Sequence, residues 1–410
     1  MIKRKLYVNV LGLGYIGLPT AALIASKGMY VTGVDINPAI VDLVNNGKVH
    51  IVEPDLEGLV YKVVQEGYLT ASMQPTESDV YIIAVPTPLT NNNLPDISFV
   101  EKAIEMIIPY VREENMIIIE STCPIGTTEK MYEKIIRAKP NLKNKIYMAY
   151  CPERVLPGRI LYELEYNSRI VGGIDKASAE KIKDFYKSFV KGDIYTTNSK
   201  VAEMCKLIEN AYRDVNIAFA NEVSMLAEDL GLNPWEVIEL ANKHPRVNIL
   251  KPGVGVGGHC IPIDPWFLIS IYPERTKLIK AAREVNMYKT QWVIEKIKKE
   301  IENFKRNFHK EPVIACLGLT YKENVDDIRE SPSLYIVEKL MKEGFEILPV
   351  DPYVEQDRIG LRLYDLNEAL NTADIVVILV PHSVFISKIL DAKTVIDFTG
   401  VLYRRFHEGN

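Results

Sequence analysis

Leu6-Tyr-Val-Asn-Val-Leu-Gly-Leu-Gly-Tyr-Ile-Gly17 decides the fold of this 410-residue chain. The largely apolar run over residues 6–11 predicts a short buried strand, and the glycines follow it directly. An apolar helical run over 18–26 ends at Gly28, and a second strand over 30–34 ends at Asp35. Strand, glycine turn, helix, strand and acid in this order predict a βαβ unit.

The three glycines of this turn, Gly12, Gly14 and Gly17, allow a tight turn and the close approach of a pyrophosphate to a helix N-terminus. Asp35 would bond a ribose 2′-hydroxyl and repel a 2′-phosphate, which favours NAD over NADP. The alternative is a glycine turn that binds no ligand.

Further strands are predicted over 80–85, 116–120 and 146–150, so the first domain is expected to be doubly wound and to span residues 1–197. Residues 200–230 form a long helical pattern, which Gly231 ends. Asn233 then caps another helix, and helices should dominate to about residue 308. Residues 198–308 are therefore expected to form a central helical domain able to dimerise.

The C-terminal part, residues 309–410, repeats the pattern of the first domain. It has a predicted strand over 313–317, a helix over 332–342 and a strand over 345–350. Its glycine turn differs, because Gly318-Leu-Thr-Tyr-Lys322 replaces the GxGxxG pattern. The expected fold class is thus α/β, with two Rossmann-like doubly wound domains joined by a long-helix central domain, the second binding a different nucleotide.

Composition excludes several classes of protein. The net charge of −5 gives no general attraction to nucleic acid or anionic membranes. The five cysteines lack CxxC spacing, so we expect a reducing compartment and no metal site. The N-terminus resembles no signal peptide and no apolar run spans a membrane, so a cytoplasmic protein is expected.

A second glycine-rich stretch, Gly253-Val-Gly-Val-Gly-Gly-His-Cys-Ile-Pro-Ile-Asp-Pro265, carries Cys260. The prolines suit the first turn of a helix over 266–270, which would place the thiol near a helix N-terminus, where thiolate is favoured. Cys260 is either a presented nucleophile or a buried thiol in a glycine-rich turn.

Three other segments leave two interpretations open. Lys206, Asn210 and Arg213 share one face of the long helix, which is either solvated or turned into a cleft. Residues 121–128 follow a strand and contain hydroxyl groups that either cap a helix or meet a ligand. Glu153 and Arg154 follow another strand and are either cleft residues or an ion pair on a loop.

These segments together resemble the UDP-glucose/GDP-mannose dehydrogenase family over essentially the whole chain. The motifs that carry the resemblance are Gly12-Leu-Gly-Tyr-Ile-Gly17, Ser121-Thr-x-Pro-x-Gly-Thr-Thr128, Pro152-Glu-Arg, Lys206-x3-Asn210, Gly257-Gly-His-Cys-Ile-Pro-x-Asp-Pro265 and Asp327-x-Arg-Glu-Ser331. Residues 152–158 and 244–250 look most like the branch that oxidises UDP-N-acetyl-D-mannosamine. UDP-N-acetylglucosamine and UDP-glucose are the alternative substrates.

The resemblance implies an NAD-dependent four-electron oxidation of the sugar C6 hydroxyl to a carboxylate, through a thiohemiacetal and a thioester on Cys260. Lys206 and Asn210 would stabilise the alkoxide and oxyanion. Asp264 would help to activate water, and Glu153 with Thr122 would handle protons or position a water. Which carboxylate is the base stays open.

The resemblance also implies the binding residues. Those for the cofactor NAD are Gly12, Gly14, Tyr15, Ile16, Gly17, Asp35, Thr87, Thr122 and Arg329. Those for the nucleotide sugar are Arg154, Val155, Lys206, Asn210, Arg213, His244, Arg246, Gly257, Tyr321 and Lys322, with His244 and Arg246 from a second subunit of a homodimer or higher oligomer.

Two rival functions remain at this point. One is an ordinary two-electron dehydrogenase in which Cys260 is structural, and the other is a nucleotide-binding regulator without catalysis. The first predicts that Cys260 is dispensable for turnover. The second predicts no NADH from any nucleotide sugar.

Overall fold

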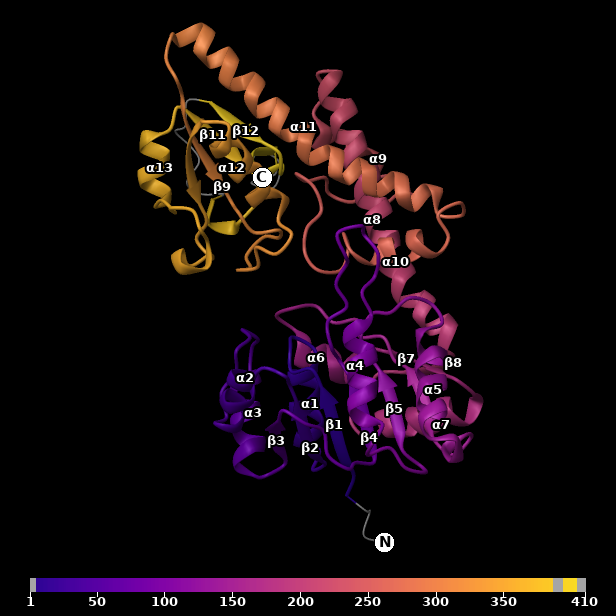
Figure 1. Ribbon diagram of the computed structural model, residues 1–410. Coiled ribbons are helices and arrows are strands. Elements are labelled where there is room, and N and C mark those ends of the chain that lie inside the picture. The colour runs from indigo at the N-terminus through magenta and orange to yellow at the C-terminus, as the bar shows by residue number, and fades with distance from the viewer. Residues whose placement is uncertain (1–4, 386–393, 404–410) are drawn as a thin grey trace. The chain divides into compact units, whose positions relative to one another are not determined.

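The computed structural model describes residues 5–385 and 394–403, and the chain divides into two compact units, residues 1–209 and 210–410 (Figure 1). The first and last few residues of the predicted terminal domains therefore lie outside the described part.

The first unit is built around a sheet of eight strands in the order β3-β2-β1-β4-β5-β6-β7-β8. The first six follow the order of a doubly wound dinucleotide-binding fold. The strands are β1 (Tyr7–Leu11), β2 (Tyr30–Val34), β3 (Leu69–Ser72), β4 (Val80–Ile83), β5 (Met116–Ile119), β6 (Tyr147–Tyr150), β7 (Arg169–Gly173) and β8 (Ile194–Asn198). All neighbouring pairs are parallel except β6 with β7, which is antiparallel.

Helices cover both faces of this sheet. They are α1 (Gly17–Ser26), α2 (Pro38–Asn45), α3 (Leu56–Gln65), α4 (Ser98–Ile107), α5 (Thr127–Ala138), α6 (Ile160–Tyr166) and α7 (Lys176–Tyr186), with a short 3-10 helix at Pro140–Leu142. Successive strand residues point to opposite faces, so Ile82 packs in the core with α1, α3 and α6, and Ile83 packs in the core with α4 and α5. Continuous apolar strands are expected when both faces are buried.

The helix α8 (Ser199–Asp229) leads into the second unit, which continues with α9 (Pro234–Ala241), α10 (Asp264–Ile271) and α11 (Lys277–Phe308). Asn233 caps α9, as predicted, because its side chain accepts the N–H groups of Trp235 and Glu236. The helix α10 is longer than the predicted 266–270. Its first turn holds Pro265, whereas Pro262 lies before the helix.

The second unit also contains a parallel sheet in the order β10-β9-β11-β12. Its elements are β9 (Val313–Leu317), α12 (Pro332–Lys342), β10 (Glu346–Val350), α13 (Leu366–Thr372), β11 (Ile375–Ile378) and β12 (Val395–Asp397), with 3-10 helices at Gln356–Arg358 and Ser383–Phe385. One sheet face packs against α11 and α12, and the other against α13. The chain thus has two doubly wound α/β sheets and long helices between them in sequence, as predicted.

No helix within the described residues combines the length and apolarity that a membrane crossing requires.

Candidate active site

The glycine turn between β1 and α1 uses each glycine for a different purpose. Gly12 has φ +91°, a left-handed conformation that permits the tight turn. A Cβ on Gly17 would lie 1.7 Å from the carbonyl oxygen of Gly12, so helix and turn pack too closely for any side chain. A Cβ on Gly14 would meet no atom within 4 Å. The open side of the turn therefore lies at Gly14, where the backbone can approach a pyrophosphate.

Asp35 lies at the end of β2 beside this turn. Its Oδ2 accepts the N–H of Leu13 at 3.0 Å and its Oδ1 accepts the N–H of Asn37 at 2.9 Å. These bonds hold the carboxylate at the edge of the sheet, and the side chain stays half-buried. The residues present fit a dinucleotide with an unmodified ribose 2′-hydroxyl.

The other predicted cofactor residues of the first unit are also at least partly accessible. Tyr15, Ile16, Thr87 and Thr122 are half-buried. The strands β4, β1 and β5 are parallel neighbours, so the segments that carry these residues follow the same edge of the sheet. Arg329 belongs to the second unit, where its guanidinium makes two hydrogen bonds of 2.8 and 2.7 Å to Asp327.

The segment after β6 carries Glu153, Arg154 and Val155. Glu153 is 8% exposed, and its carboxylate accepts the N–H of Val155 at 2.6 Å. Arg154 pairs with Glu209 at 3.0 Å. Glu153 and Arg154 are therefore not an ion pair with each other. Lys206 reaches the same segment, because its Nζ donates to the Glu153 carbonyl oxygen at 2.8 Å.

The hydroxyl groups of residues 121–128 do not cap α5. The N-cap is Gly126, and the buried carboxylate of Glu203 on α8 accepts the N–H groups of Gly126 and Thr128, at 2.5 and 2.8 Å. Because a carboxylate already occupies this helix N-terminus, a ligand phosphate cannot use the same N–H groups. Glu203 was not among the residues predicted from the sequence.

A second buried acid missed from the sequence is Glu120, at the end of β5. Tyr186 donates its hydroxyl to Glu120 Oε1 at 2.6 Å, and the guanidinium of Arg169 lies 3.4 Å from the same oxygen. Burial raises the pKa of the Glu120 carboxyl, although Arg169 and Tyr186 oppose the shift. Glu120 lies two residues before Thr122.

Cys260 is the exposed cysteine of the chain. Cys123, Cys151 and Cys316 are buried, and Cys205 is half-buried. Burial raises the pKa of the Cys316 thiol to about 12 and moves those of Cys123 and Cys151 upward in the same way. Cys260 is thus the thiol that a ligand can reach, which favours the presented nucleophile over the buried thiol.

Asp264 lies one helical turn after Cys260, and its N–H donates to the Cys260 carbonyl oxygen at 2.8 Å. Asp264 is 3% exposed, and its Oδ2 accepts the side-chain amide of Asn210 at 2.6 Å. The second unit therefore brings Asn210, Cys260 and Asp264 together.

The glycines before Cys260 pack against the altered glycine turn of the second α/β sheet. A Cβ on Gly257 would lie 2.7 Å from the Tyr321 Cβ, and one on Gly258 would lie 3.0 Å from the Tyr321 ring. Glycine is therefore required for this close approach. Four predicted substrate residues are exposed: Arg213, His244, Arg246 and Lys322.

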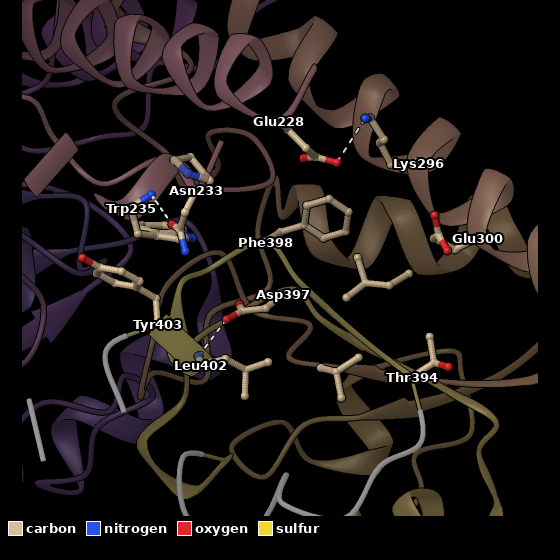
Figure 2. A pocket seen from close by; sticks show the side chains of 13 residues that line it. Glu228, Asn233, Trp235, Lys296, Glu300, Thr394, Asp397, Phe398, Leu402 and Tyr403 are labelled. Carbon is tan, nitrogen blue, oxygen red and sulfur yellow. Dashed lines mark hydrogen bonds and ion pairs between the residues drawn. The ribbon is translucent and has the colours of Figure 1, made fainter. Parts of the chain in front are cut away.

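A pocket of about 650 Å³ in the second unit lies elsewhere (Figure 2). Carboxylates of Glu228, Glu300 and Asp397 line it with one ammonium group, that of Lys296, which pairs with Glu228 at 3.1 Å. This excess of negative charge would repel a diphosphate. No residue predicted for the site lines this pocket.

The doubly wound sheet, the glycine turn open at Gly14 and the acid at the end of β2 are the features of a dinucleotide-binding protein. Models of the UDP-glucose/GDP-mannose dehydrogenase family match the chain in three parts: the NAD binding domain over residues 6–190, the central domain over 200–288 and the UDP binding domain over 315–404. The chain belongs to this family, whose members are NAD-dependent nucleotide-sugar dehydrogenases.

Three similar proteins have names that refer to amino sugars. The chain is 48% identical over 394 residues to UDP-N-acetyl-D-mannosamine dehydrogenase of Escherichia coli K12, covering 92% of this chain and 94% of that one. It is 46% identical to NDP-N-acetyl-D-galactosaminuronic acid dehydrogenase of Ralstonia nicotianae over 96% of both chains. The solved structure of UDP-D-ManNAc dehydrogenase from Pyrococcus horikoshii matches with a TM-score of 0.87 and 42% identity, over 96% of both chains.

Proposed function

We propose that this chain oxidises UDP-N-acetyl-D-mannosamine at C6 to UDP-N-acetyl-D-mannosaminuronate. The overall reaction consumes two NAD+ and one water and releases two NADH and three protons. Bound NAD+ supplies the hydride acceptor for each oxidation step. The domains proposed for this work are residues 1–197 for NAD, 198–308 for the cysteine and dimerisation, and 309–410 for the UDP-sugar.

The observation that carries the proposal is the position of Cys260. Its loop exposes the thiol, places Asp264 one turn later and holds that carboxylate through Asn210. An ordinary two-electron dehydrogenase needs no thiol at its substrate. A four-electron enzyme needs one, because a covalent thiohemiacetal keeps the aldehyde bound between the two oxidations.

In the proposed sequence, the first oxidation gives a C6 aldehyde, which the Cys260 thiolate attacks to form a thiohemiacetal. The second oxidation gives a thioester. Water, activated with the help of Asp264, adds to the thioester carbonyl, and the C–S bond breaks to return the thiolate and release the carboxylate.

Lys206 and Asn210 are proposed to stabilise the negative oxygen at each stage. The Lys206 ammonium has three N–H donors and uses one on the Glu153 carbonyl oxygen, which fixes its direction. Glu153 and Thr122 are proposed to move protons or hold a water. Asn210 also orients the Asp264 carboxylate. The same side-chain amide is therefore proposed both to stabilise the oxyanion and to position the base.

The nucleotide sugar is proposed to contact Arg154, Val155, Arg213, His244, Arg246, Gly257, Tyr321 and Lys322, and NAD to contact the glycine turn, Tyr15, Ile16, Asp35, Thr87, Thr122 and Arg329. The cationic members suit a diphosphate. The relatives named above support an amino sugar. UDP-N-acetylglucosamine and UDP-glucose stay as alternatives, and the Ralstonia relative adds the galacto epimer.

We also propose a cytoplasmic homodimer formed through α8. One side of this helix exposes large apolar side chains at spacings of three, four and seven residues, each between 41 and 73% exposed. A stripe of this kind indicates a partner surface. Its members are Val201, Met204, Ile208, Tyr212, Phe219 and Leu226, and Leu230 follows directly after the helix.

The test is the NADH yield per sugar, measured side by side with UDP-N-acetyl-D-mannosamine, UDP-N-acetyl-D-galactosamine, UDP-N-acetylglucosamine and UDP-glucose. Two NADH per molecule and the highest kcat/KM with UDP-N-acetyl-D-mannosamine are expected. One NADH per sugar would refute the four-electron reaction, and a higher kcat/KM with another sugar would refute the substrate.

A further inference from the structure

A line of buried polar side chains connects α8 and α11. Arg283 donates to Asp214 Oδ1 at 2.6 Å, and Asn286 donates its amide to the same oxygen at 2.8 Å. The Asn286 carbonyl oxygen then accepts the amide of Asn221 at 2.9 Å. All four residues are at most 4% exposed.

This order of donors and acceptors fixes how the amide of Asn221 points. Asp214 can only accept from Asn286, which turns the Asn286 oxygen toward Asn221. The Asn221 amide nitrogen must then face Asn286, and its Oδ1 is left to face the other way. There it accepts the N–H of Gly253 at 2.9 Å, at the start of the loop that carries Cys260.

The far end of the loop is bonded to the same helix. Asp264 is held by Asn210, and Asn210 and Asn221 are eleven residues apart on α8. Eleven residues make about three turns, so the two side chains lie on one face, about 16 Å apart along the axis. Residues 253–264 are thus fastened at both ends to one face of α8.

The network is poorly built for stability alone. Asp214 Oδ2 and Arg283 Nε are buried without a hydrogen-bond partner among the described residues. Such partly satisfied buried groups cost free energy that apolar side chains of the same size would not. The Asp214–Arg283 ion pair instead fixes the orientation of the side-chain amides of Asn286 and Asn221.

We propose that Asn221 is a positioning residue for Cys260, oriented by Asn286 and the Asp214–Arg283 pair. It sets the start of the cysteine loop, as Asn210 sets its end, so that the thiol meets the C6 carbon in a reactive geometry. The proposal rests on the proposed function for its kinetic consequence, but not for its structural one.

The test compares Asn221→Leu with Asn115→Leu as a matched control. Asn115 is 2% exposed, and its Oδ1 likewise accepts a backbone N–H, that of Arg112, at 2.9 Å. It lies at the start of β5, at the opposite edge of the first sheet from the glycine turn. Both variants remove a buried amide of similar structural value, and only Asn221→Leu frees the cysteine loop.

For Asn221→Leu we expect kcat to fall by about 10 to 100-fold with the KM for the UDP-sugar within about twofold, because misplacement of a reacting group acts on the chemical step. Hydrogen exchange over residues 253–260 should be faster, while exchange in α8 and α11 is unchanged. Equal kcat values in the two variants, or unchanged exchange in the loop, would overturn the proposal.

A second variant covers a failure of Asn221→Leu to fold. Thr290 donates its hydroxyl to the Val254 carbonyl oxygen at 2.9 Å, and Thr290→Val removes this bond with little change of shape. Thr290→Val should also lower kcat and speed hydrogen exchange in residues 253–260, with both changes smaller than for Asn221→Leu. If neither quantity changes, the proposal is overturned as well. If the wild-type enzyme oxidises no nucleotide sugar, the proposed function is refuted but the positioning role of Asn221 is not. That role is then tested by hydrogen exchange in residues 253–260 and by the rate at which iodoacetamide alkylates Cys260.

Discussion

Alanine substitutions at Gly14 and Gly17 should separate cofactor binding from folding within one turn. At Gly17 the new Cβ would lie 1.7 Å from the Gly12 carbonyl oxygen and 2.9 Å from its carbon. Both atoms are backbone, so α1 must move away from the sheet. Overpacking typically costs about 1–3 kcal/mol, and a contact this short with backbone atoms belongs at the upper end of that range. We expect Gly17→Ala to lose much of the stability of the first unit.

Gly14→Ala should behave in the opposite way. The new Cβ meets no atom within 4 Å, and the backbone is outside the left-handed region, so the free energy of unfolding should stay within about 1 kcal/mol of wild type. The methyl group would instead occupy the side of the turn that the pyrophosphate approaches. NAD should bind at least about tenfold more weakly, a loss of about 1.4 kcal/mol.

Urea unfolding followed by circular dichroism gives the stabilities, and calorimetric titration gives the NAD affinities. Wild-type NAD binding by Gly14→Ala would refute the assignment of this turn to the cofactor. Wild-type stability of Gly17→Ala would refute the packing argument.

Three further predictions concern the thiol, the helix stripe and acid stability. Cys260→Ser should lower turnover by about 10³-fold or more while UDP-sugar affinity changes little, and undiminished carboxylate production measured by mass spectrometry would exclude the covalent route. If the proposed dimer forms through α8, Phe219→Glu combined with Leu226→Glu should give a folded monomer in light scattering after gel filtration; a mass unchanged from that of a wild-type dimer would show that α8 is not the interface. Burial would raise the pKa of Asp351, but bonds from His382 and the N–H groups of Leu319 and Tyr353 hold that pKa below its usual value. Because the folded-state pKa lies below the unfolded-state pKa of about 4, the ionised carboxylate stabilises the folded protein fully at pH values above about 4. This stabilisation is lost as the pH falls through the folded-state pKa. Asp351→Asn should therefore cost about 1–3 kcal/mol at pH 7 and much less at pH 3, and an equal cost at both pH values in urea unfolding would contradict this.

The elements with strong local signals were predictable from the sequence. β2, β9 and α12 match their predicted bounds because apolar runs end at a glycine, an acid or a proline. The strands β7 and β8 were not identified. β7 contains Arg169 and ends in two glycines, and β8 is a polar, half-exposed edge strand, so neither shows the apolar run that indicates a strand.

Site residues could be predicted from the sequence where they belong to a recognisable motif. They could not be predicted where their role depends on being buried in the folded protein. Glu203 and Asn221 look like ordinary surface residues of a long helix. A signal exists in hindsight: Glu203, Asn210, Asp214 and Asn221 recur at spacings of seven, four and seven residues, which is the period of a buried face. Polar residues at a core period indicate a network with partners elsewhere in the chain, and the sequence alone does not identify those partners.

A comparison of the glycine turns in the two α/β sheets shows why the first sheet suits a dinucleotide and the second does not. Leu13 and Leu319 follow equivalent glycines, and each donates its N–H to an aspartate at the end of the neighbouring strand, Asp35 or Asp351. Asp35 stays half-buried, so a ribose can reach it.

In the second sheet the equivalent aspartate and turn are not accessible to a ligand in this way. Asp351 is 7% exposed and is bonded by His382 at 3.1 Å, so no ribose can reach the carboxylate. Where the first turn has Gly14 with open space beside it, the second has the buried Thr320, whose N–H also donates to Asp351 at 3.2 Å. A pyrophosphate cannot approach there as it can at Gly14. Two related sheets therefore take different nucleotides through the exposure of one aspartate and the presence of one side chain.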